Sequence, residues 1–113
     1  MHELSIVQNI IGIVARETEK SRAKRVVEVH LEIGRLSGVE FELIEFALKN
    51  LSYGSVIESA RIKIDKPAGK ARCNKCGNEF NLNDFIGSCD KCGSFNLEII
   101  KGKELRIKSI TVE

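Results

Sequence analysis

Four cysteines in two Cys-x2-Cys pairs are the strongest chemical signal in this sequence. Cys73 and Cys76 form one pair, Cys89 and Cys92 form the other, and a glycine follows each pair. Two thiolates at this spacing converge on one cation, and the glycine lets the backbone curl so that amide hydrogens approach sulfur. Four thiolates without another obvious ligand predict a closed, structural zinc site. A disulfide pair and a single rubredoxin-like iron are the alternatives.

The first three residues, Met1, His2 and Glu3, form a second candidate site. Because a bulky second residue protects the initiator from removal, we expect Met1 to keep a free amine. That amine, the imidazole of His2 and the backbone amides of His2 and Glu3 can surround one ion with nitrogen in a plane. Such sets select nickel(II) or copper(II). The first amides of a helix lack carbonyl partners, so this ligation costs no helical hydrogen bond, and its affinity should rise with pH.

Two helices are predicted around these sites. Apolar residues at Leu4, Val7, Ile11 and Val14 recur at helical spacing and predict a helix over residues 4–20, with Ile6, Ile10 and Ile13 flanking this apolar stripe. A turn and possible cap at Ser37-Gly38 precede FELIEFALKNL, where the same spacing predicts a second helix that ends near Tyr53-Gly54.

Three segments alternate as strands do. In VVEVHLEIGRL the apolar residues face one way, and we expect His30 on the opposite, solvated face. ARIKID predicts a second strand, which a break at Lys66-Pro67-Ala68-Gly69 ends. ELRIKSITVE predicts a third, with Leu105 and Ile107 inward and then Ile110 and Val112 inward. That change of parity indicates a bulge near Lys108-Ser109.

This element order predicts an α+β fold in which two helices pack on a small three-stranded sheet. The cysteine segment is then a zinc-ribbon-like lobe inserted between two strands of that sheet. We expect one domain to comprise residues 1–69 and 99–113, and the inserted four-cysteine zinc-binding domain to comprise residues 70–98. The lobe has few apolar residues, so metal binding should supply much of its folding energy.

Composition narrows the function. The chain has 113 residues, 42% of them hydrophobic and 30% charged, with a formal net charge of +2, so no polyanion-binding field is expected. No leader and no apolar run of about 20 residues is present, which predicts a soluble, cytoplasmic protein that does not span a membrane. No nucleophile–base pair or carboxylate dyad stands out, so we expect a non-enzyme.

Two other functions compete with metal handling. A zinc ribbon that binds nucleic acid is the first, since basic and aromatic side chains share the lobe: Lys70, Arg72, Lys75, Lys91, Phe80 and Phe85. Acidic Glu79, Asp84 and Asp90 interrupt that set and lower its rank. The second is a protein-interaction adaptor whose zinc only shapes a surface.

The motifs taken together resemble the HypA/HybF family of hydrogenase nickel-incorporation proteins. They are the opening MHELS, the later EIGRLSGVE, and the knuckles CNKCG and CDKCG, so the resemblance spans essentially the whole chain. It implies a nickel metallochaperone that holds Ni(II) through the Met1 amine, the His2 side chain and amide and the Glu3 amide. It assigns zinc to the four cysteines. It also implies two partners: the nickel-handling GTPase of the maturation pathway and the large subunit of a [NiFe]-hydrogenase.

Overall fold

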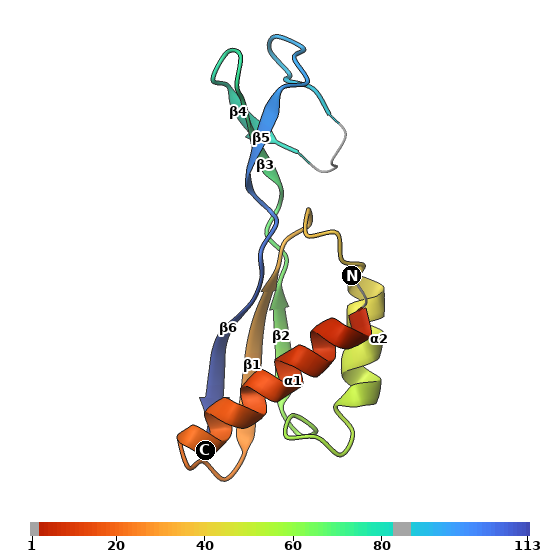
Figure 1. The fold of residues 1–113 in the computed structure, drawn as a ribbon, viewed down its shortest axis with the longest axis vertical. Helices are drawn as coiled ribbons and strands as arrows, with labels where there is room; N and C mark the ends of the chain where they lie inside the picture. Colours follow the sequence, from red (N-terminus) through yellow and green to blue (C-terminus); the bar gives the residue numbers. More distant parts are fainter. Residues whose placement is uncertain (1–2, 83–86) are drawn as a thin grey trace. The chain divides into compact units, whose positions relative to one another are not determined.

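The computed structural model describes residues 3–82 and 87–113, which form two compact units (Figure 1). The helix–sheet unit contains the chain up to Leu31, Val39–Ile64 and Ile107–Glu113. The cysteine unit contains Glu32–Gly38 and Asp65–Arg106. The predicted domains, residues 1–69 with 99–113 and residues 70–98, are segments expected to fold independently. Their limits stay a prediction.

Both predicted helices are confirmed, as α1 (Glu3–Lys20) and α2 (Phe41–Leu51). The predicted buried face of α1 is partly wrong, because Leu4 is 55% exposed and Ile11 is only half-buried. The buried stripe is rotated about the helix and consists of Ile6, Val7, Ile10, Val14 and Thr18. Spacings of three and four residues from Val7 to Thr18 keep this stripe on one face. The Leu4 side chain therefore lies on the surface near the start of the helix.

The start of α2 also differs from the prediction. The hydrogen-bonded turn lies just before the predicted one, over residues 34–37, where the Ser37 amide donates to the carbonyl of Gly34 over 3.1 Å. The residue that precedes the helix, however, is Glu40, which has extended backbone angles and makes no side-chain capping bond. Glu42 in the first turn and Lys49 in the last have the signs that the helix dipole favours.

The predicted three-stranded sheet is confirmed. It consists of β1 (Val26–Ile33), β2 (Arg61–Asp65) and β6 (Leu105–Val112) in the order β2-β1-β6. The cysteine segment leaves after β2 and returns at β6, so it is inserted between two strands that both pair with β1, as expected. In β6 the half-buried residues are Ile107 and Ile110, while Leu105 and Val112 are 38% and 36% exposed. An edge strand has one neighbour only, which leaves these two expected inward residues incompletely covered.

His30 is less exposed than the solvated strand face predicted for it. It lies in β1, the central strand, and is half-buried, with its Nε2 atom wholly enclosed. The alternation that predicted a solvated face is present, because Val29, Leu31 and Ile33 are buried. Outward side chains of a central strand are flanked by those of both neighbouring strands, and this lateral cover encloses the imidazole.

The core of the helix–sheet unit is aliphatic. Its fully buried side chains come from both helices, from β1 and from the turn before β2: Val7, Val14, Val26, Val29, Leu31, Ile44 and Ile57. Burial of each such side chain contributes about 1.5–3 kcal/mol relative to its exposure. This unit therefore has a conventional hydrophobic core that needs no metal.

The cysteine unit has a sheet of its own, which the sequence did not reveal. Its strands are β3 (Lys70–Cys73), β4 (Glu79–Asn81) and β5 (Leu97–Lys101), antiparallel in the order β4-β3-β5. A small cluster of Leu36, Ala71 and Leu82 is buried, and Phe80, Leu97 and Ile99 pack against it. Leu36 comes from the segment after β1, far from the cysteines in sequence.

Across residues 3–82 and 87–113, neither helix combines the length and the apolar character that crossing a membrane requires.

Candidate metal centre

The four cysteine sulfurs lie together in the cysteine unit, all within 4.8 Å of one another. Cys73 Sγ is 3.5 Å from Cys92 Sγ, and Cys76 Sγ is 3.5 Å from Cys89 Sγ. Sulfurs around a tetrahedral zinc with bonds of about 2.3 Å are about 3.8 Å apart. All four cysteines are free thiols, so the disulfide alternative is wrong. Each close contact joins one sulfur of each pair, which is the arrangement that a single tetrahedral ion needs.

The two pairs fold into the same knuckle. In the first, the Gly77 amide donates to the carbonyl of Cys73 and the Cys73 amide donates to the carbonyl of Asn78, both over 2.8 Å. The second repeats both bonds, from Gly93 to Cys89 over 2.9 Å and from Cys89 to Ser94 over 2.8 Å. Gly77 and Gly93 have φ values of 78° and 75°, a region that favours glycine. The predicted role of the glycines is confirmed.

Backbone amides point at the buried sulfurs. The Cys76 amide lies 3.4 Å from Cys73 Sγ. The amides of Lys91 and Cys92 lie 3.4 and 3.5 Å from Cys89 Sγ. Cys73 and Cys89 are the buried members of their pairs, whereas Cys76 and Cys92 are exposed. Hydrogen bonds to a thiolate stabilise its charge, so each knuckle offers one sulfur that is prepared for a cation.

The thiol pKa values follow this asymmetry. The Cys92 amide, ahead of the Lys91 amide and the Asn78 side chain, lowers the pKa of Cys89 to about 6 against a smaller opposing effect of burial. The Cys76 amide lowers the pKa of Cys73 in the same way. For Cys76, the Asn78 amide lowers the pKa, but the Cys89 thiol, burial and the other two thiols together raise it to about 12. Cys89 is thus favoured as a thiolate at neutral pH before an ion binds, and the pKa of Cys73 is shifted in the same direction.

Asn78 is a contributor that the sequence analysis missed. Its side-chain amide lies 3.6 Å from Cys89 Sγ and also donates to Asp90 Oδ1 over 2.5 Å. It therefore links the first knuckle to a sulfur of the second. The sequence offered one clue to this contact, because Asn78 directly follows Cys-x2-Cys-Gly. A side chain at that position comes just after the turn that encloses the sulfurs. Groups that hydrogen-bond metal ligands orient them and tune affinity.

The basic residues of the lobe are partly committed to ion pairs. Arg72 and Glu98 join β3 to β5 over 2.7 Å, and Lys70 and Glu79 join β3 to β4 over 3.3 Å. The Glu98 carboxylate, by hydrogen bond and charge, raises the pKa of Arg72 further. These pairs lie across neighbouring strands, where they support the sheet.

One aromatic residue of the predicted nucleic-acid platform also belongs to the interior of the cysteine unit. Phe80 is half-buried and packs on the buried cluster of Leu36, Ala71 and Leu82, so only part of its ring is exposed. Phe85 lies outside the described residues. The exposed aromatic ring is that of Phe95, which is 78% exposed and was not part of the predicted platform.

The N-terminal candidate site is only partly within the described chain. Met1 and His2 lie outside the described residues. Glu3 is the first residue of α1, is half-buried and is the acidic residue of its first turn. Its amide is therefore among those that have no carbonyl partner within the helix.

The fold and the sulfur cluster define a class: a small α+β protein with one closed four-cysteine zinc site of structural type. The family described as hydrogenase/urease nickel incorporation, metallochaperone, hypA matches residues 1–112. The chain belongs to this HypA family. Its members bind nickel and zinc, and the four-cysteine cluster fits the structural zinc.

Known relatives and a solved structure also support membership in the HypA family. Hydrogenase maturation factor HypA from Parabacteroides distasonis is 43% identical over 113 residues, which cover all of this chain and 98% of that protein. The protein of the same name from Rippkaea orientalis is 44% identical, over all of this chain and 96% of that protein. The solution structure of the Ni metallochaperone HypA from Helicobacter pylori is similar with a TM-score of 0.67 and 28% identity, over 99% of this chain and 97% of that one.

Proposed function

We propose that this protein binds Ni(II) at its N-terminus through Met1, His2 and Glu3 and delivers it during maturation of a [NiFe]-hydrogenase. Zinc, held by Cys73, Cys76, Cys89 and Cys92, has a structural role. One observation carries the proposal. Within residues 3–82 and 87–113, the four cysteines are the one group of three or more His, Cys, Asp or Glu side chains that converges enough to hold an ion. A nickel-handling chain must then recruit other donors.

The start of α1 has the chemistry for such donors. A terminal amine, two deprotonated amides and an imidazole supply four nitrogens in a plane, which suits a square-planar nickel(II) ion. The positive end of the helix dipole opposes a bare cation, and the amide anions together with the Glu3 carboxylate offset it. Protons leave as the ion binds, so nickel affinity rises with pH. A site on a chain terminus also lets an acceptor replace the ligands one at a time.

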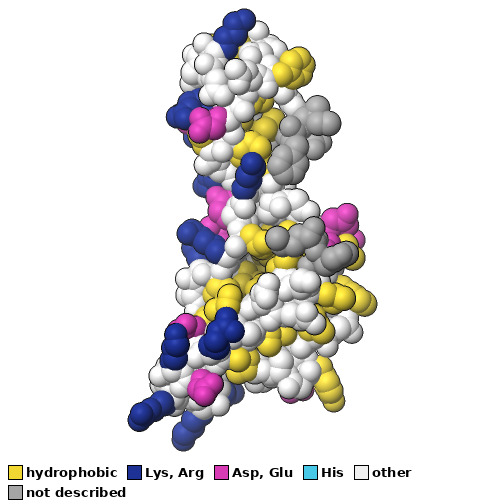
Figure 2. Space-filling view, in the orientation of Figure 1, with side chains coloured by type: hydrophobic (Ala, Val, Ile, Leu, Met, Phe, Trp, Pro, Cys, Tyr) yellow, Lys and Arg dark blue, Asp and Glu magenta, His cyan; other side chains and the backbone are white. Residues whose placement is uncertain are grey.

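The surface beside Glu3 supports a protein acceptor. Leu4, Leu43 and Phe46 are 55%, 46% and 66% exposed. With Glu3 they line an open hollow of about 540 Å³ between the starts of α1 and α2. Figure 2 shows hydrophobic side chains reaching the surface on the face of the helix–sheet unit that carries α1. Exposed apolar residues that gather in this way mark interaction surfaces.

We propose that the partners at this surface are the nickel-handling GTPase of the maturation pathway and the large subunit of a [NiFe]-hydrogenase. The names of the curated relatives as hydrogenase maturation factors support the pathway. Their meeting place is the cytoplasm, and the protein acts there by ligand exchange and not as an enzyme. The closed sulfur site supports this, because it has no open coordination position for a substrate or water.

Nickel titration by calorimetry of the zinc-loaded protein tests the proposal. His2→Ala, or acetylation of the Met1 amine, should abolish stoichiometric nickel binding while zinc stays bound. His30→Gln is the matched control, because it changes the only other histidine and should leave nickel binding unchanged. Nickel binding that survives both N-terminal changes, or that is lost with His30→Gln alone, contradicts the proposed ligands.

A further inference from the structure

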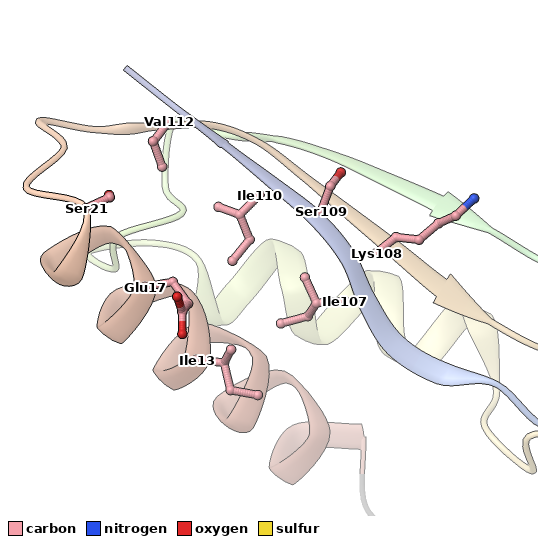
Figure 3. A pocket seen from close by; sticks show the side chains of 8 residues that line it. All are labelled: Ile13, Glu17, Ser21, Ile107, Lys108, Ser109, Ile110 and Val112. Carbon is pink, nitrogen blue, oxygen red and sulfur yellow. The ribbon is translucent and has the colours of Figure 1, made fainter.

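Strand β6 has an open edge with an apolar groove beside it. Among the described residues it pairs with β1 only, so the backbone groups along its other side are available to a further strand. The groove has a volume of about 440 Å³ and lies between β6 and the second half of α1 (Figure 3). Its apolar lining consists of Ile13 on α1 and Ile107, Ile110 and Val112 on β6. A segment that paired with β6 would place alternate side chains in this groove.

The side chains of β6 differ between its two faces. Ile110 and Val112 lie on the side of α1 and are incompletely covered, since Ile110 is half-buried and Val112 is 36% exposed. Lys108 and Ser109 point away from the helix (Figure 3). A matching strand therefore has apolar side chains on the groove side and polar ones on the other. In strand addition of this kind, main-chain hydrogen bonds supply affinity and the groove supplies specificity.

The turn that joins α1 to β1 is basic and lies at the end of β6. The Lys24 amide donates to the carbonyl of Glu113 over 2.9 Å, which fixes this position. Arg22 and Lys24 are exposed, and neither forms an ion pair with a residue that the structure describes, whereas Arg25 pairs with Glu113 over 2.8 Å. Figure 2 shows Lys and Arg side chains gathered at this end of the helix–sheet unit. Such charges favour an acidic ligand, and β6 of a second copy would instead bring the same positive charges.

We propose that β6 and this groove bind an extended acidic–apolar segment of another protein as an added antiparallel strand. Its alternating apolar side chains enter the groove between α1 and β6, and the acidic residues that precede them meet Arg22 and Lys24. Antiparallel pairing sets this order, because β6 runs toward the basic turn and the added strand runs away from it. The site uses the second half of α1 and none of Met1, His2 and Glu3, so it and nickel binding can fail separately.

Methyl NMR of the full, zinc-loaded chain tests the proposal, with the acetylated and amidated peptide DDEVTITV as the probe. The peptide should shift the signals of Ile13, Ile110 and Val112 and leave that of Ile62, on β2 at the other edge of the sheet, unchanged. We expect a dissociation constant of about 10–1000 µM, because one short strand buries less than a standard interface. The constant should rise with salt, which screens the ion pairs. A peptide with three lysines in place of the acidic residues should bind about tenfold more weakly at low salt.

Charge reversal in the protein tests the basic turn. Arg22→Glu combined with Lys24→Glu should raise the dissociation constant of the acidic peptide about tenfold at low salt. Arg61→Glu combined with Lys63→Glu is the matched control, because it reverses one arginine and one lysine at exposed positions of β2. This control should leave the constant within about twofold of the parent. Melting temperatures show that both variants are folded.

N-methylation of the probe at alternate residues tests the strand pairing. Only every second residue of an added strand directs its amide at β6, so one methylated peptide should lose binding and the other should keep it. Equal behaviour of the two methylated peptides, equal binding of the lysine peptide, or no binding at about 1 mM overturns the proposal. Signals of Ile110 that depend on protein concentration and not on peptide would assign the edge to a second copy and overturn it as well.

Discussion

The helix–sheet unit and the cysteine unit differ in what fills their interiors. In the first, fully buried aliphatic side chains from α1, α2 and β1 pack together, Val7, Leu31 and Ile44 among them. In the second, a small buried apolar cluster of Leu36, Ala71 and Leu82 is found among the described residues, and two of the four cysteines are themselves buried. A zinc ion in four thiolates contributes about 10–16 kcal/mol at neutral pH, which exceeds what so small a cluster supplies.

The different interiors of the two units fit different roles for the two metals: zinc is structural, and nickel is the proposed cargo. An ion that replaces a hydrophobic core must be enclosed and retained, as the paired knuckles allow. An ion that is cargo must be exchangeable, which suits a helix start in a unit whose stability does not depend on metal. Perturbing one unit should therefore leave the other intact.

The largest effect is expected from Cys89→Ser. This change removes the buried sulfur that accepts amides from Lys91 and Cys92, so zinc should be lost and the cysteine unit should unfold. Amide hydrogen exchange should show protection lost in β3, β4 and β5 and retained in β1 and α1. The limits of the unprotected segment also test the proposed domain limits of 70–98. Unchanged protection in the zinc-free variant contradicts the role assigned to the metal.

The reverse experiment targets the aliphatic core. Ile44→Ala in α2 should lower the free energy of unfolding of the helix–sheet unit by about 2–5 kcal/mol, because Ile44 is fully buried. Leu43→Ala is the control, since its side chain is 46% exposed and its loss should change stability by less than about 0.5 kcal/mol. Urea denaturation measures both. Zinc content should stay at one ion per chain, and loss of zinc from Ile44→Ala at low urea argues that the units are not independent.

A smaller effect is expected at Asn78, whose amide reaches Cys89 Sγ. Asn78→Ala should weaken zinc binding about tenfold in competition with a chelator. Asn96→Ala is a suitable comparison, because Asn96 bonds to Asn74 and not to a cysteine sulfur. Equal zinc affinity in both variants indicates that Asn78 has no effect on the site.

The smallest effect concerns acid release of zinc. The pKa of Cys89, lowered to about 6, keeps this buried sulfur a thiolate until the pH falls through that region, and the pKa of Cys73 is lowered as well. Below about pH 6 a proton also competes with the ion at Cys89, so zinc affinity should fall more steeply there and release should follow. Asn78→Ala should move the midpoint to higher pH, since the Asn78 side chain helps to lower the pKa of Cys89. A zinc-responsive dye reports the release, and release already complete near neutral pH contradicts this order.

Local signals in the sequence predicted most of the fold. Helical spacing placed α1 and α2, alternation placed β1, β2 and β6, and the repeated Cys-x2-Cys-Gly predicted a site whose sulfurs the structure brings together. What failed depended on contacts between distant segments. The face of α1 that is buried, the enclosure of His30 and the packing of Leu36 in the cysteine unit are set by neighbours far along the chain. The sheet of β3, β4 and β5 was missed because its strands are short and mostly polar.

The central claim is that nickel and zinc use different donors in one chain, and nickel X-ray absorption tests it most directly. The zinc-loaded protein, with an unextended N-terminus and one equivalent of nickel, should show a planar shell of four nitrogens without sulfur. His2→Ala should abolish that spectrum. Sulfur in the nickel shell of the parent protein would place nickel among Cys73, Cys76, Cys89 and Cys92 and contradict the account.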